Sequence, residues 1–534
     1  MKTRPFTPHG TGVRGLNLPR GSVLFEGAFG RIFRALPAAD FGATDGESET
    51  NLKTLGNAMV STPDDPKDGA DPEESGVPAL FTYLGQFIDH DITFDPASSL
   101  QKQDDPDGLV DYRTPKFDLD NVYGRGPDDQ PYLYDLSNGA DKAKFLFGKK
   151  LTGAPAISPE AHDLARNGAN PARAIIGDPR NDENLIVSQL QTLFLRFHNR
   201  LIDSGLGFKD AQRSMRFHYQ WMLITDFLVK LVNKETLHSV FPHLASGKSI
   251  ADDPPVLEFY APKNEAFMPL EFSVAAYRFG HSMVRPGYRL NDDDSTLLRI
   301  FPPLNKPNDP SLRGFRPPRD NWGIDWGRFI DIDTRANGVM LDDNGKINGK
   351  DPSDKQKNEM KHRLQLAYRI DSSLVNPLGG LPTDIADQIF PSLAVRNLLR
   401  GWRLRLPTGQ AVARAMGVPV LDKILIGKFE DEVDATDIND LKDAKGKPVT
   451  VFVDNCPLWT YCLAETKNFT TPGLFGVKTK QLGHVGGRIV AETFAGLLTE
   501  DRQSFFTQDP RWTPTITKGK AFGLKEFVNF AIGK

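Results

Sequence analysis

The stretch LFTYLGQFIDHD, residues 80–91, places a glutamine, two aspartates and a histidine in an otherwise apolar segment of a 534-residue chain. Its leucines, phenylalanines and isoleucine recur at helical spacing, and a proline shortly before them suits a first helical turn. Gln86 and His90 are four residues apart and share a face of the predicted helix, which Asp89 flanks. Asp91 lies about 100° further round than His90 and must point elsewhere.

These four polar groups each need a partner, because burying a polar group without a hydrogen bond is unfavourable. A core histidine tied into a local hydrogen-bond network meets this need. A catalytic site meets it equally well, because catalytic groups are often buried beside charged partners. Both interpretations stay open on this stretch alone.

A second polar stretch, RTPKFDLDNVYG at residues 113–124, alternates oxygen-bearing residues with a period of two. In an extended loop, Thr114, Lys116, Asp118 and Asp120 would place several oxygens on one side. Calcium takes roughly 6–8 hard oxygen ligands, and carboxylates, a hydroxyl and backbone carbonyls are suitable donors. A solvated acidic loop is the alternative for these residues alone.

A third stretch, GDPRNDENLIVSQLQTLFLRFHNRL at residues 177–201, carries leucines and phenylalanines at helical spacing and ends near Gly205. Arg180 precedes the predicted helix. Glu183 sits near its start, where the helix dipole favours a carboxylate. A simple first-turn capping role is the alternative for Glu183.

A fourth stretch, FSVAAYRFGHSMVRPGYRL at residues 272–290, predicts another apolar helix. This helix should stop before Pro286, because a proline disfavours the helical conformation of the residue before it. Arg278 and His281 stand three residues apart within it.

Taken in chain order, these stretches resemble the animal-type haem peroxidases, the peroxidase–cyclooxygenase superfamily. Residues 85–91 match the family's G-Q-x-x-D-H-D run, and the other three stretches match its calcium loop, its distal arginine segment and its proximal histidine segment. NLLRGWRLRLPTGQ from Asn397 and GHVGGRIVAETFAGLL at 483–498 are also similar to the family. The resemblance implies a mainly α fold, a single large helical haem peroxidase domain with little β-structure and long loops.

The implied domain covers residues 78–534 and follows an N-terminal arm and loop region over 1–77. Its expected parts are a distal helix at 78–91, the calcium loop at 113–124, a helix at 180–204 with the distal arginine and glutamate, and a proximal helix at 271–284. Residues 40–77 are rich in Asp, Pro, Gly and Ser, so we expect loop there.

The resemblance also implies a haem b and the residues that serve it. The implied catalytic residues are His90, Arg180 and Gln86. His281 would bind the haem iron, and Asn397 would hydrogen-bond the other ring nitrogen of His281. The further implied haem contacts are Arg278 and Arg400 to the propionates, and Asp89 and Glu183 as ester links to haem methyl groups. Other arginines stand close to Arg400, so a solvated cation is the alternative there.

One calcium ion is implied in the same way. Its implied ligands are Asp91, Thr114, Lys116 through its carbonyl, Asp118 and Asp120. Asp120 stands where many relatives have serine, which is another hard oxygen donor. The ion would hold the distal helix from behind, which agrees with Asp91 pointing away from Gln86.

For function, the resemblance implies a peroxidase that reduces hydrogen peroxide and oxidises halides, thiocyanate or phenols through a ferryl haem. A fatty-acid dioxygenase of the same superfamily is an alternative, but it needs a tyrosine three residues before the proximal histidine. Arg278 holds that position here, and Tyr277 is four residues before His281. A non-catalytic haem-binding protein is a further alternative, although it would lose distal residues that this chain retains.

Composition agrees with an ordinary globular protein, with 39% hydrophobic and 25% charged residues and a net charge of −4. No polybasic stretch argues for nucleic acid or an anionic membrane, and no window approaches a membrane span.

The chain has two cysteines, Cys456 and Cys462, which could pair, but a disulfide-rich framework is excluded. With so few cysteines, the chain resembles a bacterial-type member of the family. The first residues lack the apolar core of a standard signal peptide, so we expect a soluble protein that is cytoplasmic or exported by a signal-independent route. The oligomeric state stays open.

Overall fold

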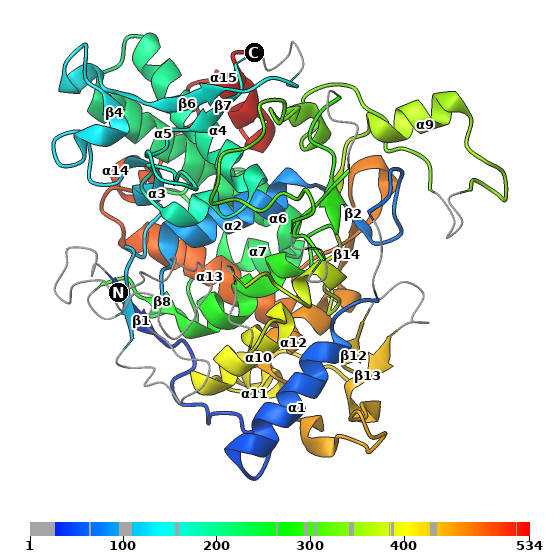
Figure 1. Cartoon of the computed structure of the whole chain (residues 1–534). Helices are drawn as coiled ribbons and strands as arrows, with labels where there is room; N and C mark the ends of the chain where they lie inside the picture. The colour runs from blue at the N-terminus through cyan, green and yellow to red at the C-terminus, as the bar shows by residue number, and fades with distance from the viewer. Residues whose placement is uncertain are drawn as a thin grey trace.

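Helix α2 (Leu80–Ile92) runs through the middle of the molecule in Figure 1. Its apolar side chains are buried, and the ring of Phe87 stacks on Phe194 of α4 (Leu185–Asp203) with ring centroids 4.0 Å apart. The helix predicted from the opening stretch is therefore confirmed. Because apolar side chains line most of its circumference, the helix brings its polar residues into the core as well.

The computed structural model describes residues 27–62, 66–95, 109–154, 160–262, 265–292, 297–303, 306, 308–340, 346–383, 385, 389–427, 435–518 and 521–534. Residues 1–26 of the N-terminal arm and loop region lie outside these residues. The α-helices are α1 (Asp45–Ala58), α2, α3 (Asp120–Tyr123), α4, α5 (Phe208–Met222), α6 (Leu228–Leu231), α7 (Lys234–Val240), α8 (His243–Ser246), α9 (Asp354–Lys361), α10 (Leu393–Arg403), α11 (Gly409–Met416), α12 (Leu458–Ala464), α13 (His484–Glu500), α14 (Phe505–Gln508) and α15 (Leu524–Ile532).

Strands are short and pair in small sheets, so the mainly helical prediction is confirmed. They are β1 (Gly27–Gly30), β2 (Glu74–Pro78), β3 (Val110–Asp111), β4 (Tyr134–Asp135), β5 (Lys144–Phe145), β6 (Phe147–Lys150), β7 (His162–Leu164), β8 (Met268–Pro269), β9 (Gly287–Tyr288), β10 (Leu298–Arg299), β11 (Leu366–Tyr368), β12 (Leu425–Ile426), β13 (Thr436–Asp437), β14 (Thr470–Pro472) and β15 (Lys478–Lys480). Strand β1 pairs antiparallel with β3 and parallel with β8, which joins three distant parts of the chain.

Helix α4 is fixed at both ends by side chains. Asn184 is its N-cap, and the Asn184 side-chain oxygen accepts hydrogen bonds from the amides of Ile186 and Val187. Near its other end, Phe197 stacks on Phe527 of α15 with ring centroids 4.6 Å apart. The C-terminal helix therefore covers α4 and keeps it in the core.

The proximal helix expected at 271–284 is not continuous, and this part of the prediction is wrong. The segment forms η5, a π-helical turn (Glu271–Ala275), followed by η6, a 3₁₀ helix that ends at His281. Ala275 takes the non-helical torsions φ −126° and ψ −79° between them. The Arg278 side chain donates to the Ser273 carbonyl at 2.7 Å, which satisfies a backbone group at the break.

The loop expected over residues 40–77 is also corrected, because residues 45–58 form α1. Thr44 caps the helix, and Leu52 and Leu55 are fully buried. The helix packs against α10, where a Cβ on Gly56 would come within 2.8 Å of Val395. Aspartate, serine and glycine suggested a loop, but these residues also suit a capped first helical turn.

Helices α5 and α6 are joined by a π-helical turn over Leu223–Phe227. Cys456 and Cys462 are both buried and are not joined by a disulfide. Across the described ranges, no helix combines the length and the apolar character needed to cross a lipid bilayer.

Candidate functional site

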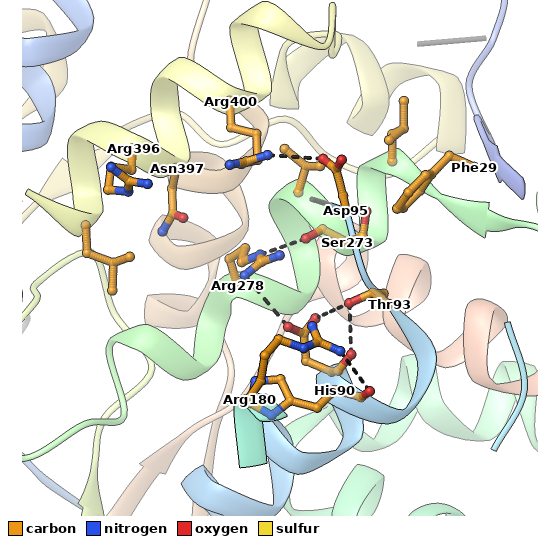
Figure 2. Close-up of a pocket in the computed structure, with 14 residues that line it drawn as sticks. Phe29, His90, Thr93, Asp95, Arg180, Ser273, Arg278, Arg396, Asn397 and Arg400 are labelled. Carbon is orange, nitrogen blue, oxygen red and sulfur yellow. Dashed lines mark hydrogen bonds and ion pairs between the residues drawn. The ribbon is translucent and has the colours of Figure 1, made fainter. Parts of the chain in front are cut away.

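Two adjoining cavities open beside α2. The first, here called the histidine cavity, encloses about 890 Å³ between His90 of α2 and His281 at the end of η6. The second, the arginine cavity, encloses about 720 Å³ and is lined by Arg180, Arg278 and Arg400 (Figure 2). Asp89, His90 and Arg278 line both cavities.

His90 is held in one ring orientation on the α2 side. Its Nδ1 lies 2.7 Å from Oδ1 of Asn181, whose amide nitrogen donates to Gln191 at 2.9 Å. Because the Asn181 oxygen is an acceptor, the His90 Nδ1 carries the proton and the lone pair lies on Nε2. Nε2 lies 3.7 Å from Oε1 of Glu183, which also lines the histidine cavity. Burial first, and then the charge of Arg180, lower the pKa of His90 to about 4, so its ring is a neutral base near pH 7.

Arg180 lies beside His90 and is buried. Its guanidinium donates to Asp178 at 2.7 Å and to the His90 carbonyl at 2.9 Å. The ring of Phe94 lies 4.6 Å from the guanidinium carbon, at a distance typical of a cation–π contact. Burial opposes the charge of Asp178, but Arg113 and Arg180 hold the pKa of that carboxyl well below its usual range.

Gln86 and Glu183 form a second polar group on the same side of the histidine cavity. The Gln86 amide nitrogen donates to Oε1 of Glu183, and the Asn184 amide nitrogen donates to the Gln86 oxygen at 3.0 Å. Asn184 therefore orients the Gln86 amide while it caps α4. Sequence reasoning missed this role, although an asparagine directly before an apolar helical run is a recognisable N-cap signal.

Two structural corrections concern the distal residues. Arg180 lies in η3, a 3₁₀ turn over Pro179–Asp182, and Glu183 follows it, so neither belongs to the helix expected at 180–204. Helix α4 starts only at Leu185, because Asn184 caps it. The short turn before the helix brings the side chains of Arg180 and Glu183 to α2.

His281 lines the same cavity as His90. Its Nδ1 lies 2.8 Å from the side-chain amide of Asn397 on α10. The amide oxygen and nitrogen of an asparagine are assigned from the hydrogen-bond network. With the Asn397 oxygen turned toward Nδ1, the ring carries its proton there and leaves the Nε2 lone pair for a metal.

The arginine cavity combines cations with carboxylates. Arg278 lies 3.8 Å from Asp89, and Arg400 pairs with Asp95 at 3.1 Å. Burial raises the pKa of Asp89, but Arg278, the other nearby cations and a hydrogen bond from Thr93 outweigh it, so the net shift is downward. Arg396 also lines this cavity and is only 4% exposed, so it is not the solvated neighbour of Arg400 that the sequence suggested.

The residues of both cavities fit a haem. His281 and His90 both line the histidine cavity, and His90 is held there as a base. Apolar side chains close the edges of the histidine cavity, namely Val284, Ile300, Phe301, Leu378, Leu381 and Leu393. The adjoining cationic side chains suit the two carboxylates of a porphyrin.

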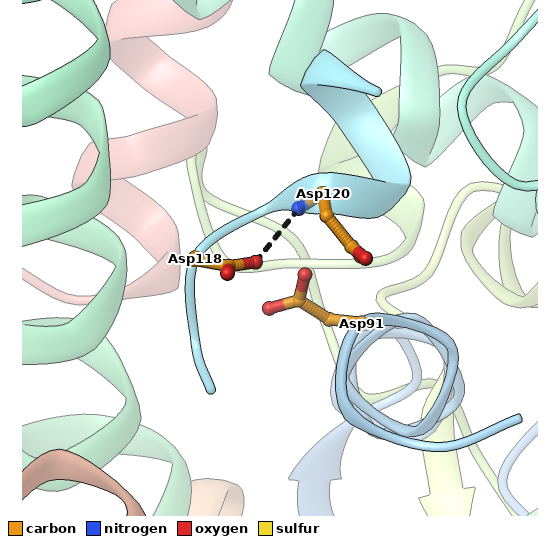
Figure 3. A group of neighbouring side chains, drawn as sticks. All are labelled: Asp91, Asp118 and Asp120. Atoms are coloured by element: carbon orange, nitrogen blue, oxygen red, sulfur yellow. Dashed lines mark hydrogen bonds between the residues drawn. The ribbon is translucent and has the colours of Figure 1, made fainter. Parts of the chain in front are cut away.

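A separate acidic cluster lies on the other side of α2. Asp91, Asp118 and Asp120 offer oxygen atoms within 4.8 Å of one another (Figure 3). Asp91 is fully buried, and neither of its carboxylate oxygens has a hydrogen-bond partner of normal geometry among the described residues, although the Tyr219 hydroxyl lies near. Burial and the neighbouring carboxylates raise the pKa of Asp91 well above its usual range. A divalent cation would offset these charges, so the donor set fits a hard metal ion.

The period of two had suggested an extended loop, and this expectation is wrong. The loop that carries this cluster is turned. Leu119 takes a left-handed conformation with φ 62°, and the turn of α3 begins directly after it. This turn brings Asp118 and Asp120 together, and the Asp120 amide donates to Asp118 at 3.1 Å. Thr114 donates to the other Asp118 oxygen at 2.9 Å, and the Lys116 amide donates to the Thr114 carbonyl at 2.8 Å.

Part of the chain is similar in sequence to known proteins. A sequence model of the family described as "Animal haem peroxidase" matches residues 97–309. The chain is 26% identical over 191 residues to the human "Probable oxidoreductase PXDNL" and 27% identical over 188 residues to "Peroxidasin homolog pxn-1" of Caenorhabditis elegans. These alignments cover 34% and 33% of this chain, but only 12% and 14% of those much longer proteins.

Solved structures share the fold over almost the whole chain. "Peroxidase A" of Dictyostelium discoideum superposes with a TM-score of 0.57 at 16% identity and covers 99% of this chain and 98% of its own. The fatty acid alpha-dioxygenase of Arabidopsis thaliana superposes with a TM-score of 0.51 at 15% identity, covering 99% of this chain and 82% of its own. The described helices therefore form the haem peroxidase fold, and residues 97–309 are similar in sequence to the animal haem peroxidase family.

Proposed function

We propose that this chain is a haem peroxidase that reduces hydrogen peroxide and oxidises small donors. The observation that carries the proposal is that two differently held histidines line the histidine cavity, with a buried arginine beside one of them. Fixed charges and a base at one face of the cavity suit cleavage of a peroxide bond. Small anions such as halides or thiocyanate, and phenols, are the proposed donors.

On the proximal side, His281 holds the haem iron through Nε2. Asn397 supports this role because its amide contacts Nδ1 and fixes the ring tautomer. Arg278 and Arg400 bind the two propionates. When bound, the haem supplies an iron centre that peroxide oxidises and that then accepts electrons from the donor.

On the distal side, His90 removes a proton from the bound peroxide and returns it to the departing oxygen. Its low pKa keeps Nε2 free to accept that proton at neutral pH. Arg180 keeps a permanent positive charge beside the oxygen that becomes negative. Gln86, oriented by Asn184, positions water or a halide in the same space.

Asp89 and Glu183 are proposed to form ester bonds to haem methyl groups. Both carboxylates line the histidine cavity from its distal side. Each bond would join a carboxylate oxygen to a methyl carbon, which loses one proton and two electrons, and hydrogen peroxide is the two-electron oxidant. Asn184 stands where some relatives have a methionine that links to haem, so a third link is not expected.

The acidic cluster is proposed to bind one calcium ion. Asp91, Asp118 and Asp120 would supply carboxylate oxygens, Thr114 its hydroxyl and Lys116 its carbonyl. The support is the burial of Asp91 without a normal hydrogen bond at either oxygen. The ion would tie α2 to the loop before α3.

A fatty-acid dioxygenase is the second candidate, since one structural neighbour is named as a fatty acid alpha-dioxygenase. One feature bears on it directly: Tyr277 lines the histidine cavity, and its ring stacks on Phe272 with centroids 4.5 Å apart. Arg278, however, occupies the position three residues before His281. We therefore favour the peroxidase.

Replacing His281 by alanine should abolish stable haem binding, because no other described histidine lines the proximal wall of the cavity. Haem content per chain and the visible absorption spectrum measure this effect. His362→Ala changes a half-exposed histidine outside both cavities and should keep full haem content. An unchanged spectrum in His281→Ala would remove the basis of the assignment.

His90→Ala should slow the reaction with hydrogen peroxide by about 10²–10⁴-fold, the usual contribution of general acid–base catalysis. Rapid mixing followed by absorption measures the rate, and haem content should stay normal. Tyr277→Phe is the comparison and should alter donor oxidation little. Oxygen uptake with a polyunsaturated fatty acid that disappears in Tyr277→Phe would favour the dioxygenase instead.

Peroxide-treated protein should retain its haem after extraction with acidic organic solvent, because an ester is not broken by unfolding. Mass spectrometry of the chain measures the added haem mass. Asp89→Asn and Glu183→Gln should each remove one link, and the double variant should release all haem. Complete release from the treated unmodified chain would show that no ester forms.

The purified protein should contain about one calcium per chain, as expected for an all-oxygen site. Asp91→Asn should lower this content, because it removes the most buried carboxylate of the cluster. Asp129→Asn, which changes an exposed acid that pairs with Arg125, is the matched control. Elemental analysis after preparation without chelator decides the question, and an absence of calcium would contradict the assignment.

A further inference from the structure

A continuous row of ion pairs joins the acidic cluster to the distal arginine. Asp120 accepts from Arg113 at 3.1 Å, Arg113 donates to Asp178 at 3.0 Å, and Asp178 accepts from Arg180 at 2.7 Å. Arg180 in turn donates to the His90 carbonyl. Arg113, Asp178 and Arg180 are each less than a tenth exposed, so water screens these contacts little.

The two carboxylate oxygens of Asp120 have different surroundings. Its Oδ2 accepts from Arg113, whereas its Oδ1 is buried and has no hydrogen-bond partner among the described residues. A cation between Asp91, Asp118 and Asp120 can therefore take Oδ1 while Oδ2 keeps its contact with Arg113. A residue with one side-chain oxygen, such as serine, could not make both contacts in this way.

Arg113 uses its planar fork to connect the two acids. Nη1 reaches Asp120, Nε and Nη2 reach Asp178, and Nη2 also donates to the Gly177 carbonyl at 3.2 Å. Lysine carries the same charge but cannot span two carboxylates with this fixed geometry. Asp178 continues the row, because its Oδ1 accepts from the Arg180 backbone amide at 2.8 Å as well as from the side chain.

We propose that Arg113 and Asp178 are positioning residues that transmit cation occupancy of the acidic cluster to Arg180. Without a cation, Asp91 and Asp118 repel Asp120, and its displacement pulls on Arg113 and Asp178. With the cation bound, Asp120 is anchored, and the row holds the Arg180 guanidinium beside His90. This inference rests on the proposed function, since it gives the cation a regulatory role at the haem site.

The experiment measures fluoride binding to the ferric holoprotein by absorption, with calcium and after chelation. Fluoride is a small anion that binds iron and accepts a hydrogen bond from a distal cation. Because a hydrogen bond to a charged group is worth roughly 1.5–3 kcal/mol, calcium should tighten fluoride binding about tenfold or more. Amide hydrogen exchange over residues 177–183 is the second readout, does not depend on haem, and should slow when calcium binds.

Arg113→Lys and Asp120→Ser should hold calcium but lose this response, with less than about a twofold change in fluoride affinity. Arg125→Lys is the matched control, because Arg125 is an exposed arginine that pairs with Asp129. It should keep the full response of both readouts. If Asp120→Ser no longer binds calcium, Arg113→Lys decides alone, because Arg113 supplies no oxygen to the cation.

Two results would overturn the inference. One is a wild-type protein that gains and loses calcium with no change in fluoride affinity or exchange. The other is an Arg113→Lys protein that keeps the full response of both. Failure of the proposed function looks different, since the protein would then lack a haem spectrum or fail to react with peroxide while hydrogen exchange still reports on the row.

Discussion

The arrangement of the site depends on two ion pairs, which Asp178 makes with the guanidinium groups of Arg113 and Arg180. Asp178 lies in the turn before α4 and is almost fully buried. Removing Asp178 would take away the carboxylate that pairs with the buried Arg180 guanidinium, which is strongly destabilising. The turn before α4, the loop before α3 and the end of α2 are therefore locked together by charge as well as by apolar packing.

The same principle explains why α2 tolerates so many polar residues in the core. His90, Gln86 and Asp89 each meet a partner from another segment, and the partners come from the turn before α4 and from η6. Asp91 differs, because among the described residues its oxygens have only the nearby Tyr219 hydroxyl and the other acids of the cluster. A cation bound there would compensate the buried carboxylate.

The break between η5 and η6 has a comparable role on the proximal side. A regular α-helix over this segment would set the directions of Arg278 and His281 by helical spacing alone. The change of pitch at Ala275 instead lets Arg278 contact both the Ser273 carbonyl and Asp89, while His281 faces the histidine cavity. Such irregular turns are common at functional sites.

Apolar spacing in the sequence was enough to predict α2 and the later part of α4, because such patterns act within a few residues. The resemblance in the motifs implied the mainly helical class and the match at α13. It also pointed to His90, Arg180, His281 and Asn397, which the structure brings to two adjoining cavities. Only the tertiary structure decided four other features. They are the packing of α1 on α10, the break before His281, the contact of Asn184 with Gln86, and the row of ion pairs from Asp120 to Arg180. No spacing rule could show these features, since each depends on which distant charge or surface a side chain meets after folding.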